Sequence, residues 1–245
     1  MSGISGKIVL GVAAAVILLT LAIVFLTGGS PDVSSGDPSQ RIAAIHEIAV
    51  NRPSDAGDTL AKAAASDPSA KVRREAMAGV SHFLKAGHIK VLRKSTKDSD
   101  PGVRAIVGDT LGAYAEKYPD KDKAVTADLI AMVAEDPVET VRQGALRGLA
   151  RCDDPKSIVT LLDRAEHGAG RETKLVAMKA LLRKLGVRLS RDRDPKDDRG
   201  WRDLIQRWKQ SRRIQKAYAA AGERLVQRPQ DILGKDWHPE RRGRQ

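Results

Sequence analysis

A short phrase that recurs along the chain constrains its fold more than any other feature of the sequence. It reads DPSAKVRREAMAGV from residue 67, DPGVRAIVGDTL from residue 100 and DPVETVRQGALRGLA from residue 136. In each copy an arginine directly follows a valine and stands six positions after an aspartate, in the pairs Asp67 and Arg73, Asp98 and Arg104, and Asp136 and Arg142. The copies are about 30–38 residues apart, a period that is typical of repeat proteins.

Each copy is expected to begin a helix, because aspartate caps free backbone N–H groups and proline fits the first helical turn. Apolar residues then recur at helical spacing, as in Val72, Ala76 and Val80, which places them on one face. A second helical pattern accompanies each copy, in DAGDTLAKAAA, GHIKVLRKST, AVTADLIAMVAE and PKSIVTLLDRA. Neither helix is apolar enough to be stable alone, so we expect stacked helix pairs that bury a shared core.

The composition favours the same fold. Aromatic residues make up only 3% of the chain, while alanine and charged residues, which are strong helix formers, are abundant. The single cysteine, Cys152, excludes an internal disulfide and a multi-cysteine zinc site. We therefore predict an all-α protein, an α-solenoid of about five helix pairs over residues 37–186.

The first and last copies depart from the pattern. The first begins at Asp37, with Ile42 in the valine position and Ala43 where the arginine is expected. The last has Lys174 in the arginine position and Gly168 where the aspartate is expected. Terminal repeats are commonly atypical because one of their faces has no neighbouring repeat.

The Asp-Pro at the helix start and the Val-Arg in the next turn resemble HEAT repeats, particularly the short bacterial kind also seen in phycobilin-lyase-like repeat proteins. The resemblance covers residues 37–186. It implies a ladder between neighbouring repeats, in which the aspartates at 67, 98 and 136 pair with the arginines at 73, 104 and 142. It also implies a scaffold more than an enzyme, because the family contains mostly scaffolds. The other interpretation of the arginines is a row that reads a ligand.

The chain begins with a segment of different composition. Residues 8–27, IVLGVAAAVILLTLAIVFLT, contain no charge and are long enough to cross a bilayer, so we predict a transmembrane helix between a flank at 1–7 and a flexible linker at 28–36. A cleavable signal peptide is the alternative. Lys7 precedes the span and Asp32 follows it, so the positive-inside rule places the bulk of the chain on the non-cytoplasmic side.

The chain ends in a basic region. Residues 187–226 are predicted to form a charged loop and one amphipathic helix, and residues 227–245 an irregular basic tail. The helix either packs on the last repeat as a cap or binds anionic lipid or a protein groove. Its candidate basic and aromatic surface consists of Trp201, Trp208, Arg212, Arg213 and Lys216.

The sequence offers no catalytic constellation. It has no Gly-rich phosphate loop, its five histidines lack metal-ligand spacing, and no histidine lies near Cys152 in the sequence. We therefore predict no catalytic residues, metal or cofactor. The predicted function is a membrane-anchored scaffold that binds a protein partner on the concave surface of the solenoid.

Two other functions stay open at this point. The first is an enzyme of the lyase or DNA glycosylase kind built on the same repeats. The second is binding of anionic lipid or nucleic acid, which the net charge of +12 and the basic C-terminal region favour.

Overall fold

The computed structural model describes residues 32–186 and 198–222. Over these residues the regular structure is helical, and no strand is present. The chain divides into two compact units, Met1–Ile106 and Val107–Gln245. The predicted repeat domain, residues 37–186, therefore extends over both units. The longest described helix, α6 (Pro101–Lys117), begins in the first unit and ends in the second.

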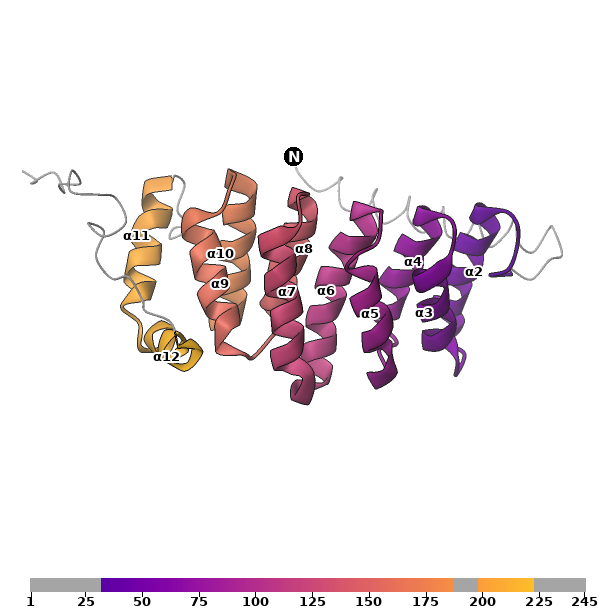
Figure 1. The fold of residues 1–245 in the computed structure, drawn as a ribbon, viewed down its shortest axis with the longest axis horizontal. Coiled ribbons are helices and arrows are strands. Elements are labelled where there is room, and N and C mark those ends of the chain that lie inside the picture. The colour runs from indigo at the N-terminus through magenta and orange to yellow at the C-terminus, as the bar shows by residue number, and fades with distance from the viewer. Residues whose placement is uncertain (1–31, 187–197, 223–245) are drawn as a thin grey trace, which may run out of the picture. The chain divides into compact units, whose positions relative to one another are not determined.

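The first unit is built from helices that pack in pairs (Figure 1). They are α2 (Pro38–Asn51), α3 (Ala56–Ser66), α4 (Ala70–Val80), the 3-10 turn η1 (Ala86–His88) and α5 (Ile89–Ser95). Helix α4 packs against α2 and α3, and α5 packs against α3. Val72, Ala76 and Val80 are all buried, as their helical spacing predicts.

The second unit continues this pattern. Its helices after α6 are the 3-10 turn η2 (Pro119–Lys121), α7 (Asp122–Glu135), α8 (Glu139–Leu149), α9 (Pro155–His167), α10 (Arg171–Leu185), α11 (Asp198–Lys209) and α12 (Arg212–Ala221). Helix α7 packs on α8, α9 packs on α10, and α8 packs on α10 (Figure 1). An α-solenoid is built by stacking helix pairs in this way.

Glycines set the distance between α6 and α8. A Cβ atom at Gly108 would lie 2.6 Å from the backbone nitrogen of Ala145. A Cβ atom at Gly148 would lie still closer to the backbone oxygen of Gly108, and one at Gly112 would meet the Cα atom of Gly148. The two helices therefore touch backbone to backbone, which leaves no room for a larger residue at the contact.

The aspartates that precede the helices act in two ways. Asp37 is the N-cap of α2 and is followed by proline in the first turn, as predicted, and Asp154 caps α9 in the same way. Asp67 instead ends α3, and α4 begins three residues later. Its side chain still accepts a hydrogen bond from the Ser69 N–H at 2.8 Å, so it fixes the turn between the two helices.

The structure corrects the prediction of a single-pass membrane protein. Within residues 32–186 and 198–222, no helix is long and apolar enough to cross a membrane. Helix α6 has 17 residues and carries charged side chains, whereas a span needs about 20 mostly apolar residues. The predicted span, residues 8–27, and the flank before it lie outside the described residues.

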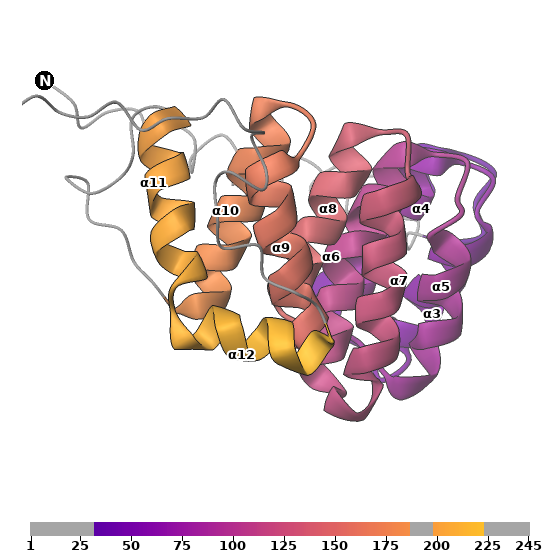
Figure 2. The same ribbon diagram turned by 60° about the vertical axis from the view of Figure 1, so that its left-hand side comes forward.

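Residues 198–222, the described part of the C-terminal region, form two helices where the sequence pattern predicts one. Helix α11 ends at Lys209, and Ser211 caps α12 by accepting a hydrogen bond from the Ile214 N–H at 3.3 Å. Both helices pack against α9, and α12 runs across the end of the α9–α10 pair (Figure 2). The loop at 187–197 and the predicted tail at 227–245 lie outside the described residues.

Candidate functional site

The recurring charged residues form a ladder of hydrogen bonds, which we call the Asp/Arg ladder. Arg73 donates from Nε to Oδ2 of Asp98 and from Nη2 to Oδ1, both at 2.8 Å. Its Nη1 donates to the backbone carbonyl of Asp67, at 2.8 Å. Each guanidinium therefore closes the turn of its own repeat and holds the carboxylate of the next, which is the geometry that the planar fork of arginine favours.

The first rung uses an arginine that the sequence pattern missed. Arg41 donates to both carboxylate oxygens of Asp67, at 2.7 and 2.9 Å, and to the backbone carbonyl of Ser35 at 2.7 Å. The residue in the ladder position is therefore Arg41, two residues before Ala43. Ser35 takes the place of the aspartate, because the first rung needs only a backbone carbonyl there.

The ladder keeps its aspartates ionised. Burial opposes the charge of Asp67, but hydrogen bonds from the Arg41 side chain and the Ser69 N–H outweigh it, and the pKa of Asp67 is lowered. Burial also opposes the charge of Asp98, and the Arg73 side chain and the Asp100 N–H outweigh it, so the pKa of Asp98 is lowered as well. Both carboxylates are charged at neutral pH and accept the arginine hydrogen bonds.

The other predicted ladder residues make the same contact within their own repeat. Arg104 donates to the backbone carbonyl of Asp98 at 2.7 Å, and Arg142 donates to that of Asp136 at 2.8 Å. After Arg142 the ladder changes, because Gly168 stands where the next aspartate would be. The first turn of α10 is held instead by Thr173, whose hydroxyl donates to Oε1 of Glu139 at 2.7 Å.

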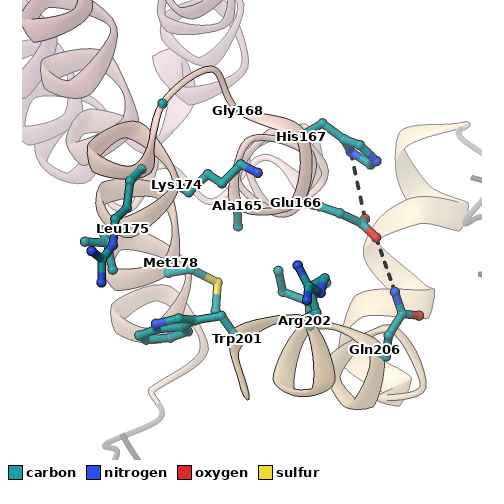
Figure 3. A pocket seen from close by; sticks show the side chains of 13 residues that line it. Ala165, Glu166, His167, Gly168, Lys174, Leu175, Met178, Trp201, Arg202 and Gln206 are labelled. Carbon is teal, nitrogen blue, oxygen red and sulfur yellow. Dashed lines mark hydrogen bonds and ion pairs between the residues drawn. The ribbon is translucent and has the colours of Figure 1, made fainter. Parts of the chain in front are cut away.

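A pocket of about 460 Å³ opens next to this last repeat (Figure 3). It lies between α10, the turn that joins α9 to α10, and α11, and we call it the α10–α11 pocket. Its apolar lining includes Leu175, Met178, Trp201 and Ile205. Sequence patterns did not predict this pocket, because α10 and α11, which line it, are separated by residues 187–197.

Three cationic side chains line the α10–α11 pocket: Arg171, Lys174 and Arg202. Among the described residues, none of the three has an ion-pair or side-chain hydrogen-bond partner. Arg171 and Lys174 come from the first turn of α10, and Arg202 comes from α11. The pocket therefore combines positive charge with an apolar wall.

The acidic residue of the pocket is already neutralised. Glu166 accepts hydrogen bonds from Nζ of Lys209 and from Nε2 of Gln206, at 2.8 and 3.2 Å. The Lys209 side chain is only 5% exposed, so this ion pair holds α11 against the end of α9. His167 lies 3.9 Å from Glu166 on the other side (Figure 3).

The structure separates the residues of the predicted basic and aromatic surface. Trp201 lines the α10–α11 pocket, whereas Trp208 is buried. Arg213 donates to the backbone carbonyls of Leu185 and Lys184, at 3.1 and 3.0 Å, and so caps the end of α10. Arg212 and Lys216 are exposed on α12.

The Cys152 thiol and the His88 ring, which could be reactive elsewhere, have structural surroundings here. Burial raises the pKa of the Cys152 thiol to about 12, which removes the thiolate at neutral pH. His88 accepts a hydrogen bond from the Lys85 N–H at Nδ1, and its Nε2 faces Asp58 at 3.2 Å, so both ring nitrogens are occupied. In the described part of the chain, no group of three or more His, Cys, Asp or Glu residues could hold a metal ion.

Comparison with known proteins identifies part of this architecture. A family model described as HEAT repeats matches residues 89–182, which is less than half of the chain. No curated protein matches the chain. The match and the helix pairs together support a HEAT-repeat protein. The narrower similarity to phycobilin-lyase-like repeat proteins stays a prediction.

Proposed function

We propose that the chain is a non-catalytic scaffold that binds a protein partner. The observation that carries this proposal is the Asp/Arg ladder, in which Arg41 and Arg73 hold neighbouring repeats together through Asp67 and Asp98. The recurring charges are thereby used to fix the spacing of the helices. A rigid row of helices at fixed spacing offers an extended surface, which is what repeat proteins use to bind other proteins.

The proposed partner surface is the exposed side of α8 and α10 in the second unit, on the concave side expected for such a stack. In the second unit this side carries Arg147, which donates to Asp109 at 2.8 Å, and Arg151, which donates to Glu116 at 3.2 Å. These pairs are partly exposed and join α6 to α8 and to the turn after it, where Arg151 lies. Mixed charges of this kind suit the polar rim of a protein interface.

The absence of catalysis is part of the same proposal. It is supported by the raised pKa of the Cys152 thiol and by the occupied nitrogens of His88. The burial of Trp208 and the capping role of Arg213 also favour a structural role for the C-terminal helices over a lipid or nucleic-acid surface.

Site-specific photo-cross-linking in the full chain tests the proposal. A benzoylphenylalanine at Lys179, exposed on α10, is expected to capture one protein from a lysate of the source cells, and the purified protein should bind the native chain. The same probe at Asp163, exposed on α9, is the control and should capture far less of it. Failure to recover a protein whose binding can be reconstituted would overturn the proposal.

A further inference from the structure

Lys174 occupies the arginine position of the last repeat, and it does so in the same helical register. Its backbone N–H donates to the carbonyl of Gly170, as that of Arg73 donates to Ser69. The residue before it, Thr173, is buried to the same degree as Val72. The Lys174 side chain therefore leaves α10 at the point where Arg73 leaves α4.

Lys174 differs from the ladder arginines in the residues that face its side chain. Arg41 and Arg73 each meet a carboxylate supplied by the following repeat. The next described element after α10 is α11, and within the described residues no carboxylate pairs with Lys174. The lysine faces the α10–α11 pocket instead (Figure 3). The pocket is thus the place where the next carboxylate of the ladder would be expected.

The charge of the pocket favours an anion. Arg171 and Arg202 line it beside Lys174, and all three lack ion-pair partners among the residues described. The carboxylate of Glu166 does not offset them, because Lys209 already contacts it at 2.6 Å. Three unpaired cations around one cavity attract a carboxylate more strongly than isolated surface lysines do.

The pocket also has an apolar lining. Leu175 and Met178 from α10 and Trp201 from α11 lie beside the cations, so an aliphatic or aromatic side chain next to the carboxylate would bury its surface there. A volume of about 460 Å³ is that of a pocket for a small ligand or a few residues of a peptide. A nucleic-acid strand would instead need cations spaced along a groove.

We propose that the α10–α11 pocket binds an acidic peptide segment of a protein partner, with one carboxylate on Lys174 completing the Asp/Arg ladder. An apolar side chain of the same segment packs on Trp201. This inference rests on the proposed function, because it takes the ligand to be part of a protein.

Peptide binding to the full chain tests the proposal. The probe is fluorescein-labelled Glu-Phe-Glu-Leu-Glu, its control is Gln-Phe-Gln-Leu-Gln, and the readout is fluorescence anisotropy. Because the chain has a net charge of +12, acidic peptides are attracted to many places on it, and a matched charge control is needed. Lys179 provides it, since it is exposed on the same helix and does not line the pocket.

The Lys174→Glu variant is expected to weaken binding of the acidic peptide about tenfold or more, and Lys179→Glu by about twofold or less. The Lys174→Glu variant should in turn bind Lys-Phe-Lys-Leu-Lys more tightly than the native chain does. A purely structural role of Lys174 would not produce this reversal. Circular dichroism of each variant checks that the helices are retained.

Three results would overturn the proposal. They are equal weakening by the two variants, equal binding of the glutamine peptide, and displacement of the peptide by single-stranded DNA or phosphatidylserine vesicles in a manner that depends on Lys174. The scaffold proposal can fail or stand separately. If the protein captured by cross-linking binds the Lys174→Glu variant as tightly as the native chain, the pocket assignment is wrong and the scaffold remains.

Discussion

Arg73 holds the carboxylate of Asp98 through two parallel hydrogen bonds of 2.8 Å, although the two residues are 25 positions apart. The same guanidinium contacts the backbone carbonyl of Asp67. We predict that Arg73→Lys destabilises the protein nearly as much as Arg73→Ala, by about 2 kcal/mol, because one ammonium cannot make all three contacts. Urea denaturation of the full chain measures the free energy of unfolding.

Lys71→Ala is the control for this prediction. Lys71 lies on the same helix, is exposed and has no partner among the described residues. Its substitution should change the free energy of unfolding by less than about 0.5 kcal/mol. An Arg73→Lys variant as stable as the native chain would show that the three contacts contribute nothing.

The ladder predicts a loss of stability in acid. The pKa values of Asp67 and Asp98 are lowered from 3.8 in the folded protein, so the unfolded chain binds protons first as the pH falls. Their contribution is present above pH 3.8 and is lost as the pH falls through the folded pKa values. The double variant Asp67→Asn, Asp98→Asn should therefore be less stable at pH 7 and lose less stability below pH 4.

Thermal unfolding followed by circular dichroism between pH 2 and pH 7 checks this expectation. An Asp55→Asn variant serves as the control, because Asp55 is exposed and, among the described residues, makes no contact with a neighbouring repeat. Parallel pH curves for the native chain and the double variant would contradict the prediction.

The contact between α6 and α8 should not tolerate a side chain. A Cβ atom at Gly148 would overlap the backbone oxygen of Gly108, and a helix backbone cannot move aside as a flexible side chain can. We expect Gly148→Ala to cost about 3 kcal/mol in the free energy of unfolding. Gly87→Ala is the matched control, because no atom of the described residues lies within 4 Å of a Cβ atom there. A Gly148→Ala variant as stable as the Gly87→Ala variant would contradict the close approach.

The ladder shows how far the sequence predicts the fold. The spacing of Val72 and Arg73 predicts a helix face and a repeat, because burial and pairing each need a residue type at a fixed position. The same spacing did not identify the ladder arginine of the first repeat, because Arg41 follows Gln40 and not a valine. The backbone carbonyl of Ser35 accepts the hydrogen bond from Arg41 there. Every residue has such a carbonyl, so no residue type in the sequence indicates this contact.

The α10–α11 pocket could not be predicted, for a different reason. Gly168 was recognised as a missing aspartate, but the consequence depends on where α11 packs. That packing is set by Trp208 and by the pair of Lys209 with Glu166, residues 43 positions apart. The amphipathic pattern within residues 187–226 predicted one helix, because the cap at Ser211 interrupts the helix without breaking the apolar spacing.

Cys152 should be unreactive in the folded protein. Its side chain is fully buried, and burial raises its pKa to about 12. We expect a thiol reagent such as Ellman's reagent to label it in native buffer at pH 8 only as fast as the protein opens, and completely in denaturant. Rapid stoichiometric labelling of the native chain would show that the thiol is accessible.

The pair of Lys209 and Glu166 should decide whether α11 stays docked. Both side chains are largely buried, at 5% and 14% exposed, so Lys209→Ala leaves a carboxylate with little water around it. We expect this variant to lose about 3 kcal/mol and to speed hydrogen exchange in α11. Lys209→Met combined with Glu166→Gln should regain most of the loss, because removing both charges removes the unpaired one. If the double variant exchanged as fast as Lys209→Ala, the attraction between the two charges, and not the burial of an unpaired carboxylate, would be what holds the helix.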